Sequence, residues 1–218
     1  MIFLLPCQDI QVKISLVCRH VIILLHGTMN DPVIRSAFHC SILKPAHNDR
    51  NTLVIDELGL KNGIVRADIA VLNGKLVGYE IKGEKDSLTR LLPQVAAYSE
   101  VFENSYIIAA EKHLAKVEHH VPEWWGIYAI SPDEHGAPCF AIKRKAEANP
   151  ARNNFGIAQL LWKAEVSDIL AGNYGVKIKQ SYTRQHLYQM LAEACDTVNL
   201  ASIVLKYLKQ REGWRTDH

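Results

Sequence analysis

Six short apolar segments in the middle of the chain have the composition of β-strands. Two of them flank the dipeptide Asn73-Gly74, which is a strong signal for a β-hairpin. The first segment is a short β-branched run that we expect to end near Glu57. The predicted strands cover residues 53–55, 64–72, 75–82, 105–110, 126–130 and 139–143.

Segments with apolar residues three and four positions apart predict helices before, between and after these strands. We expect Asp31 to cap the first helix with Pro32 at its first position, and Pro93 to kink the second. The helices after the first are predicted at residues 86–102, 111–119, 155–171, 183–194 and 197–211. This order predicts an α/β core, a mixed β-sheet flanked by helices, at residues 29–145 and a helical C-terminal extension at residues 146–218.

Residues 1–28 do not fit this pattern. Their two apolar runs, 2–5 and 21–25, are separated by polar and charged residues, and neither approaches the roughly 20 residues that span a bilayer. They also lack the single apolar block and small-residue cleavage site of a signal peptide. We therefore interpret residues 1–28 as an upstream extension outside the core, and expect a cytoplasmic protein that does not contact a membrane.

Charge and cysteine content narrow the functional classes only slightly. Residues 53–142 hold 8 Lys and Arg against 13 Asp and Glu, whereas residues 143–218 hold 12 against 7. This distribution suits a metal site beside a phosphate-attracting surface, but charge alone favours two solvated faces with a chance bias. The 5 cysteines have no C-x-x-C spacing, which disfavours a disulfide framework or a zinc site and predicts free thiols.

The turn at Asn73-Gly74 decides which side chains of the hairpin share a face. A two-residue turn would place Asp68 opposite Tyr79, so that both faces mix apolar and charged groups. A three-residue loop with Gly74 in the left-handed conformation instead places Asp68 opposite Gly78 and makes Asp68 and Glu80 diagonal neighbours, roughly 7–8 Å apart. We predict the second register, because it separates the apolar stripe from a polar face that also holds Lys82. Gly78 would leave room above Asp68.

Two carboxylates on one hairpin suit Mg²⁺ or Mn²⁺, which take oxygen ligands and retain several waters. Asp68 and Glu80 are the predicted ligands, with the carbonyl oxygen of Ile81 as a third. Lys82 beside the ion would orient a water and stabilise charge on a phosphate. The implied reaction is the hydrolysis of a phosphodiester bond by a metal-activated water. The alternative is a partly exposed charged cluster without a catalytic role.

The stretch from Arg66 to Lys82 resembles the signature of the PD-(D/E)XK nuclease superfamily, with Asp68 as the motif aspartate and Glu80-Ile81-Lys82 as the E-x-K. Ala67 replaces the usual proline. The resemblance implies a restriction-endonuclease-like core and Asp68, Glu80 and Lys82 as catalytic residues.

Two further features belong to the same resemblance. Glu57 lies where the superfamily often has an acidic residue before the hairpin, and Gln94-Val-Ala-Ala-Tyr98 resembles the Q-x-x-x-Y motif of RecB-like members. On a helix Gln94 and Tyr98 share one face. The resemblance implies that Glu57, Gln94 and Tyr98 are accessory site residues.

Residues 29 to about 215 also resemble a bacterial family of uncharacterised PD-(D/E)XK-like proteins. Three motifs carry this resemblance: G-Y-E-I-K at residues 78–82, D-x-L-x-R-L-x-x-Q at residues 86–94 and V-P-x-W-W-G at residues 121–126. The resemblance implies nuclease activity, although members of the superfamily with an intact triad also act in binding alone.

Several other residues are candidates for contact with nucleic acid. We expect backbone phosphates to be bound by basic side chains, namely Arg66, Arg90, Lys143, Arg144 and Lys145. Asp86 is a candidate helix cap, Trp124-Trp125 are predicted to pack in the core, and the histidines near residues 113–120 are predicted on the surface.

These observations favour a Mg²⁺- or Mn²⁺-dependent nuclease that acts on DNA. The alternative is a catalytically silent nucleic-acid-binding or regulatory module with the same fold. A third interpretation is a structural α/β domain that binds a partner protein on its C-terminal helices, which are also candidates for a homodimer surface.

Overall fold

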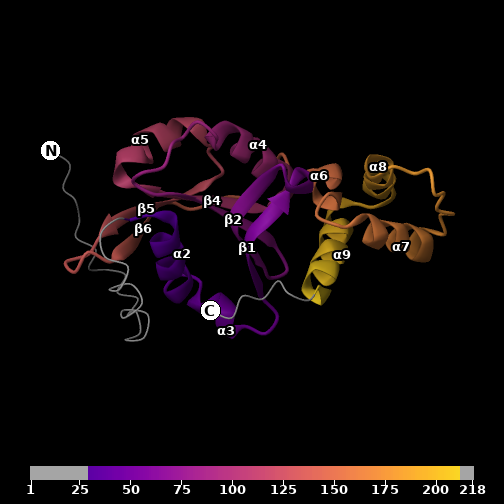
Figure 1. Cartoon of the computed structure of the whole chain (residues 1–218), viewed down its shortest axis with the longest axis horizontal. Coiled ribbons are helices and arrows are strands. Elements are labelled where there is room, and N and C mark those ends of the chain that lie inside the picture. The colour runs from indigo at the N-terminus through magenta and orange to yellow at the C-terminus, as the bar shows by residue number, and fades with distance from the viewer. Residues whose placement is uncertain (1–28, 212–218) are drawn as a thin grey trace.

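The computed structural model describes residues 29–211, and the predicted extension at residues 1–28 lies outside them. The described residues form a mixed α/β fold around an open sheet of six strands in the order β1-β2-β3-β4-β5-β6 (Figure 1). The strands are β1 (Leu53–Leu60), β2 (Val65–Leu72), β3 (Leu76–Lys82), β4 (Asn104–Ala110), β5 (Gly126–Pro132) and β6 (Pro138–Arg144). The pairs β3–β4 and β4–β5 are parallel, and the other three pairs are antiparallel.

Helices cover both faces of the sheet. The helices α2 (Asp31–Cys40) and α3 (Lys44–Asn48) lie on one side, and α4 (Leu91–Val101) and α5 (Glu111–His120) lie on the other (Figure 1). Each side has its own hydrophobic cluster, with Ile34 and Phe38 in the cluster under α2 and with Leu91 and Val117 in the cluster under α4 and α5. The strands β2 and β3 are thus buried on both faces.

The C-terminal region consists of α6 (Asn154–Ala158), α7 (Lys163–Tyr174), α8 (Arg184–Ala194) and α9 (Thr197–Gln210). The single helix predicted at residues 155–171 is therefore two helices, separated by residues 159–162. These helices extend away from the sheet beside α4 (Figure 1). Their apolar residues Ile157, Leu187 and Leu200 belong to the same hydrophobic cluster as Tyr98 of α4. The C-terminal region is thus packed continuously with the core.

The helix starts differ from the predictions in two places. Asn30, and not Asp31, caps α2, because its side chain accepts a hydrogen bond from the N–H of Val33. The helix predicted from residue 86 begins only at Leu91, so Pro93 lies in its first turn. A proline is tolerated there because N–H groups of the first turn have no partner within the helix, and the predicted kink is wrong.

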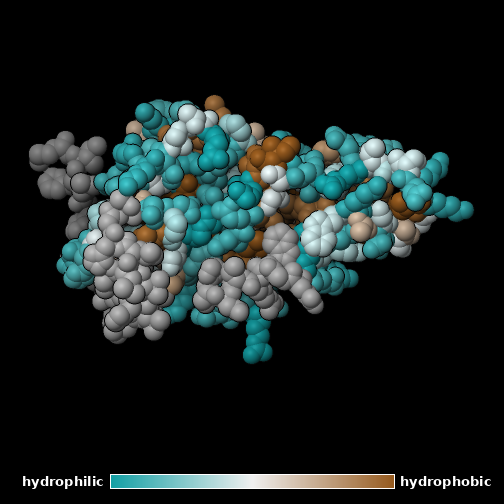
Figure 2. All heavy atoms as spheres, viewed as in Figure 1, coloured by the Kyte–Doolittle hydropathy of each residue, from teal (hydrophilic) through white to brown (hydrophobic). Residues whose placement is uncertain are grey.

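The cysteines among the described residues differ in their bonding state. Cys195 is a buried free thiol, but Cys40 and Cys139 are disulfide-bonded, so the prediction of free thiols is wrong for these two. Among residues 29–211 no helix is both long and apolar enough to cross a membrane. Figure 2 shows a face that is mainly hydrophilic, with a hydrophobic area in the region of α4 and α6.

Candidate active site

The loop at residues 73–75 sets the register of β2 against β3. Leu72 pairs with Leu76, the N–H of Asn73 donates to the carbonyl of Lys75, and Gly74 has φ 64°, the predicted left-handed conformation. The loop thus has three residues, as predicted, but it begins one residue later on both strands. Gly78 pairs with Ala70, and the next step beyond Ile69–Tyr79 brings Asp68 across from Glu80.

This register differs from the predicted one by two residues, which keeps every β3 side chain on its predicted face. The predicted role of Gly78 is wrong, because a Cβ atom there would lie 2.5 Å from the ring of Phe102. Gly78 therefore allows the ring of Phe102 to approach the strand. Ala67 also departs from the prediction and packs in the cluster under α4, whereas Ile69 packs in the cluster under α2.

The side chains of Glu80, Lys82, Gln94 and Tyr98 form an inner cluster between β3 and α4. Glu80 is completely buried, and the Nζ of Lys82 lies 2.5 Å from its Oε1. The hydroxyl of Tyr98 donates to Oε2 of Glu80 over 2.8 Å. Burial raises the pKa of Glu80, and the ammonium group of Lys82 opposes this rise. The inner cluster holds one carboxylate in a fixed orientation.

Gln94 and Tyr98 reach this cluster from successive turns of α4, which is the shared face that the sequence predicts. A hydrogen bond from Gln94 to Glu80 lowers the pKa of that carboxyl. The other polar atom of this amide, Oε1, is buried and has no hydrogen-bond partner within the described residues. Burial raises the pKa of Tyr98 well above its ordinary value, so the hydroxyl keeps its proton.

Asp68 lies between the inner cluster and the opposite face of the sheet. Its Oδ2 accepts a hydrogen bond from the N–H of Ile81 over 2.7 Å, and its Oδ1 lies 3.7 Å from a guanidinium nitrogen of Arg35. Burial raises the pKa of Asp68 to about 8, with a further contribution from the charge of Glu80, while the N–H of Ile81 lowers it. Two desolvated carboxylates therefore lie on neighbouring strands.

The backbone of Asp68 does not take part in the pairing between β1 and β2. Pairing runs through Asp56–Ile69 and Leu58–Ala67 but skips Glu57 and Asp68, and Glu57 has φ 57°. A non-glycine residue with positive φ inside a strand is strained. The strand predicted to end near Glu57 continues to Leu60 on the far side of this irregularity.

Both backbone groups of Asp68 find partners outside the sheet. The N–H donates to the hydroxyl of Tyr98 over 3.3 Å, and the carbonyl accepts from Nη1 of Arg35. The interruption at Glu57 thus lets α4 and α2, on opposite faces of the sheet, both contact the backbone of Asp68.

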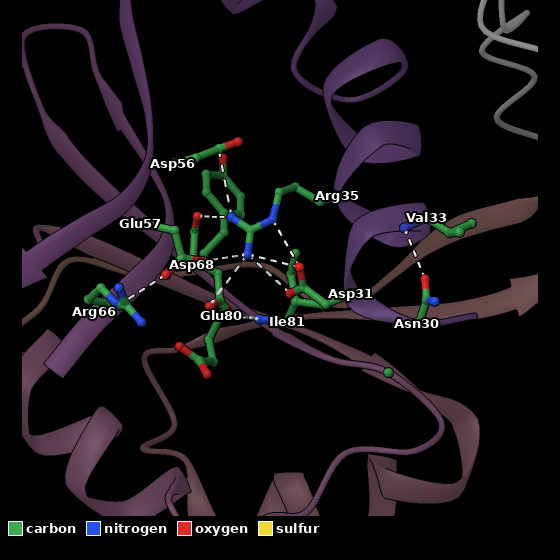
Figure 3. Close-up of polar contacts among 12 residues, drawn as sticks. Asn30, Asp31, Val33, Arg35, Asp56, Glu57, Arg66, Asp68, Glu80 and Ile81 are labelled. Atoms are coloured by element: carbon green, nitrogen blue, oxygen red, sulfur yellow. Dashed lines mark hydrogen bonds and ion pairs between the residues drawn. The ribbon is translucent and has the colours of Figure 1, made fainter. Parts of the chain in front are cut away.

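An outer cluster surrounds Arg35 of α2 and consists of Asp31, Arg35, Asp56 and Glu57 (Figure 3). The guanidinium group lies 3.0 Å from a carboxylate oxygen of Asp31, 2.9 Å from Glu57 and 3.8 Å from Asp56. None of Asp31, Arg35 and Asp56 was predicted in the site. The only sequence signal for them is the spacing of Asp31 and Arg35, four residues apart at the start of a helix.

The donors at Asp68 and Glu80 fit a small, hard cation. The carbonyl of Ile81 points to the same edge of β3 as its N–H, which binds Asp68. Residues 29–211 contain no group of three or more His, Cys, Asp or Glu side chains arranged to hold a metal. Two carboxylates and one carbonyl are nevertheless sufficient for an ion that retains several waters.

The predicted nucleic-acid contacts fall into two groups. Arg66, Arg90, Lys143 and Lys145 are exposed, and Arg66 also lies 3.2 Å from Glu57. Arg144 is half-buried and donates to the carbonyls of Trp125 and Pro122. The guanidinium of Arg144 thus holds the loop before β5.

Three remaining predictions concern packing. The ring of Trp125 is fully buried with its centroid 5.2 Å from that of Tyr98, which confirms the core interpretation for this tryptophan. His113 was predicted on the surface but is buried, with Nε2 3.1 Å from the carbonyl of Gly83. Asp86 accepts a hydrogen bond from the N–H of Gly83 instead of capping α4.

Comparison with known proteins gives one family. Residues 33–217 match the family model described as bacteriophage P4 protein cII. Protein cII of Enterobacteria phage P4 is 29% identical over 158 residues, which are 72% of this chain and 59% of the phage protein, so the match spans less than two thirds of that protein. The solved structure of the SPO1766 protein of unknown function from Silicibacter pomeroyi covers 81% of this chain and 89% of its own, with 14% identity and a TM-score of 0.35.

Proposed function

The chain belongs to the bacteriophage P4 protein cII family, and we propose that it is a metal-dependent nuclease of the PD-(D/E)XK type that hydrolyses phosphodiester bonds in DNA. Under this proposal the mixed sheet with α2 and α4 on its two faces is a restriction-endonuclease-like core. The observation that carries the proposal is the convergence of Asp68, Glu80 and Lys82 at one end of the hairpin between β2 and β3.

Asp68 and Glu80 would hold Mg²⁺ or Mn²⁺ together with the carbonyl of Ile81. Such an ion lowers the pKa of a bound water and polarises the phosphoryl group. Both oxygens of Glu80 have a partner within the protein, Oε1 in Lys82 and Oε2 in Tyr98. In Asp68 the N–H of Ile81 binds Oδ2, which leaves Oδ1 less engaged. Gln94 and Tyr98 hold Glu80 from α4, which supports their proposed accessory role.

Lys82 would supply the positive charge next to the reacting phosphate. Its ammonium group is buried and lies 2.5 Å from Glu80, so its position is fixed by an ion pair. A fixed cation in a site of low dielectric stabilises developing negative charge better than a mobile one in water. The exposed Arg66, Arg90, Lys143 and Lys145 are the proposed contacts to the DNA backbone.

The test is cleavage of plasmid and single-stranded DNA by the full chain with Mg²⁺ or Mn²⁺. We expect cutting that EDTA abolishes and that falls by at least about 100-fold in Asp68→Asn and in Lys82→Ala. Lys75→Ala is the matched control, because Lys75 is an exposed lysine at the other end of the same hairpin. It should cut as the wild type does.

Two outcomes would contradict the proposal. Equal cutting by the wild type, Asp68→Asn and Lys82→Ala would assign the activity to a contaminating nuclease. A folded wild-type chain that binds DNA but cuts neither substrate with either metal would favour the silent binding module instead.

A further inference from the structure

Arg35 is held by acidic groups on almost every side. Its Nε and Nη2 donate to the two carboxylate oxygens of Asp31 over 3.0 and 3.1 Å, Nη2 also donates to Glu57 over 2.9 Å, and Nη1 donates to the carbonyl of Asp68. The side chain is only 14% exposed. Figure 3 shows this guanidinium group in the middle of the outer cluster, between α2 and the strands.

Acidic side chains outnumber basic ones around Arg35, although Asp56 also lies 3.0 Å from Nε2 of His39. Four carboxylates, those of Asp31, Asp56, Glu57 and Asp68, lie within 4 Å of a guanidinium group that carries a single charge. The exposed Arg66 contacts only the outermost of them, Glu57. A second cation near Asp68 would therefore find a favourable potential, but Arg35 already occupies part of the space.

Asp68 is the carboxylate that Arg35 and a divalent ion would share. Its Oδ2 is engaged by Ile81, so Oδ1 is the oxygen with free capacity for a metal, and Oδ1 is also the atom that faces Arg35. A guanidinium nitrogen 3.7 Å from that oxygen would lie within a few ångströms of any ion bound to it. Like charges at such a separation in a partly buried site repel each other strongly.

We propose that Arg35 is an internal counter-ion that competes with the divalent cation for Asp68, and that it thereby sets the cation concentration at which the site fills. This inference rests on the proposed function, because it takes Asp68 as a metal ligand. In the absence of the ion, Arg35 lies beside Oδ1 of Asp68 and binds its backbone carbonyl. When the ion binds, Arg35 shifts toward Asp31, Asp56 and Glu57, which retain it in the outer cluster.

The test is calorimetric titration of the full chain with Mn²⁺. We expect Arg35→Gln, which removes the charge but keeps a side-chain N–H donor, to bind Mn²⁺ about tenfold more tightly than the wild type. Arg66→Gln removes the same charge from the far side of Glu57 and should stay within about twofold of the wild type. Asp68→Asn identifies the heat that belongs to this site.

The opposite result would overturn the inference. If Arg35→Gln binds Mn²⁺ equally or more weakly, Arg35 is a positioning residue for the backbone of Asp68. Tighter binding without DNA cleavage would support the inference while the nuclease proposal fails. Cleavage by the wild type without tighter binding in Arg35→Gln would leave only the nuclease proposal standing, and no Mn²⁺ binding in either protein would overturn both.

A second measurement needs no substitution. In the wild-type chain, the Nε–H resonance of Arg35 should shift during a Mg²⁺ titration with the same midpoint as the backbone N–H of Ile81, which reports on Asp68. A resonance of Arg35 that does not move while that of Ile81 shifts would overturn the competition.

Discussion

The two charged clusters beside Asp68 differ in how their buried charges are compensated. The inner cluster on the α4 side contains one carboxylate and one ammonium group, both almost fully buried and 2.5 Å apart. The outer cluster on the α2 side gathers several carboxylates around one guanidinium group, and those of Asp31 and Glu57 are 35% and 45% exposed. In the inner cluster the charge of the carboxylate is compensated by the ammonium group of Lys82. In the outer cluster, water also solvates part of the charge.

We therefore expect the inner cluster to be rigid and the outer cluster to rearrange more easily. A buried pair cannot lose one member without leaving a charge in a medium of low dielectric, so Glu80 and Lys82 have little freedom. Partly hydrated carboxylates tolerate a change of counter-ion, because water screens them while it occurs. Asp68 contacts both clusters, through Tyr98 on the inner side and Arg35 on the outer side.

The largest expected effect breaks the inner cluster. Lys82→Met leaves the buried carboxylate of Glu80 without its cation, and we expect it to lower the free energy of unfolding by about 3–5 kcal/mol in urea titrations with EDTA. Arg35→Met in the outer cluster should cost no more than about half as much. The double variant Glu80→Gln/Lys82→Met should recover most of the loss. Equal losses in Lys82→Met and Arg35→Met would contradict the distinction between the clusters.

A smaller effect on stability is expected from the ionisation of Asp68, which lies between the two clusters. The pKa of Asp68 is raised from 3.8 to about 8, so in the metal-free protein its protonated form stabilises the fold. That contribution is fully present below about pH 4 and is lost as the pH rises through about 8. Asp68→Asn keeps an acceptor for Ile81 and cannot ionise, so we expect it to exceed the wild type by on the order of 2 kcal/mol at pH 9 and to match it near pH 4.

Urea unfolding at both pH values with EDTA measures this difference. Asp168→Asn, which changes an exposed carboxylate on α7, is the control and should follow the wild type throughout. Parallel stability curves for Asp68→Asn and the wild type between pH 4 and pH 9 would show that Asp68 is as well solvated in the fold as in the unfolded chain.

The smallest expected effect lies in the backbone of the outer cluster. Glu57 has φ 57° within β1, a conformation that costs most residues about 1 kcal/mol and costs glycine almost nothing. We therefore expect Glu57→Gly to be about 1 kcal/mol more stable than Glu57→Ala in thermal unfolding, the reverse of the usual order in a strand. Both variants lose the same ion pairs, so their difference isolates the backbone. A more stable alanine variant would contradict the strained conformation.

Most strands could be located from the sequence because short apolar runs and the Asn73-Gly74 turn mark them directly. The strands from β2 to β6 end within one or two residues of their predicted bounds. The helices were harder to delimit where polar residues are ambiguous. Asp86 has the chemistry of a helix cap but binds the loop at Gly83, and the run from Phe155 is apolar enough for one helix although it contains a break.

The site also contains residues that could be predicted from the sequence and residues that could not. Asp68, Glu80 and Lys82 belong to one hairpin, so the alternation of side chains predicted that they lie close together. It did not predict their alignment, because the register differs by two residues and the pairing of β1 with β2 is interrupted at Asp68. Arg35 reaches Asp68 across 33 residues, because α2 packs on β3 with the ring of Phe38 against that of Tyr79. No local pattern records this packing, and the outer cluster is therefore visible only in the folded chain.

The three-residue loop at residues 73–75 has a consequence for how this protein tolerates changes in length. Eleven residues separate Asp68 from Glu80, and the loop fixes their alignment from the far end of the hairpin. A single inserted residue that was absorbed by β3 would turn Glu80 and Lys82 to the α2 side and bury Ile81 in their place. An insertion confined to the tip would leave both carboxylates where they are. We therefore expect length changes to be tolerated at the tip of this loop and not within β3, and position 74 to favour glycine because its φ is 64°.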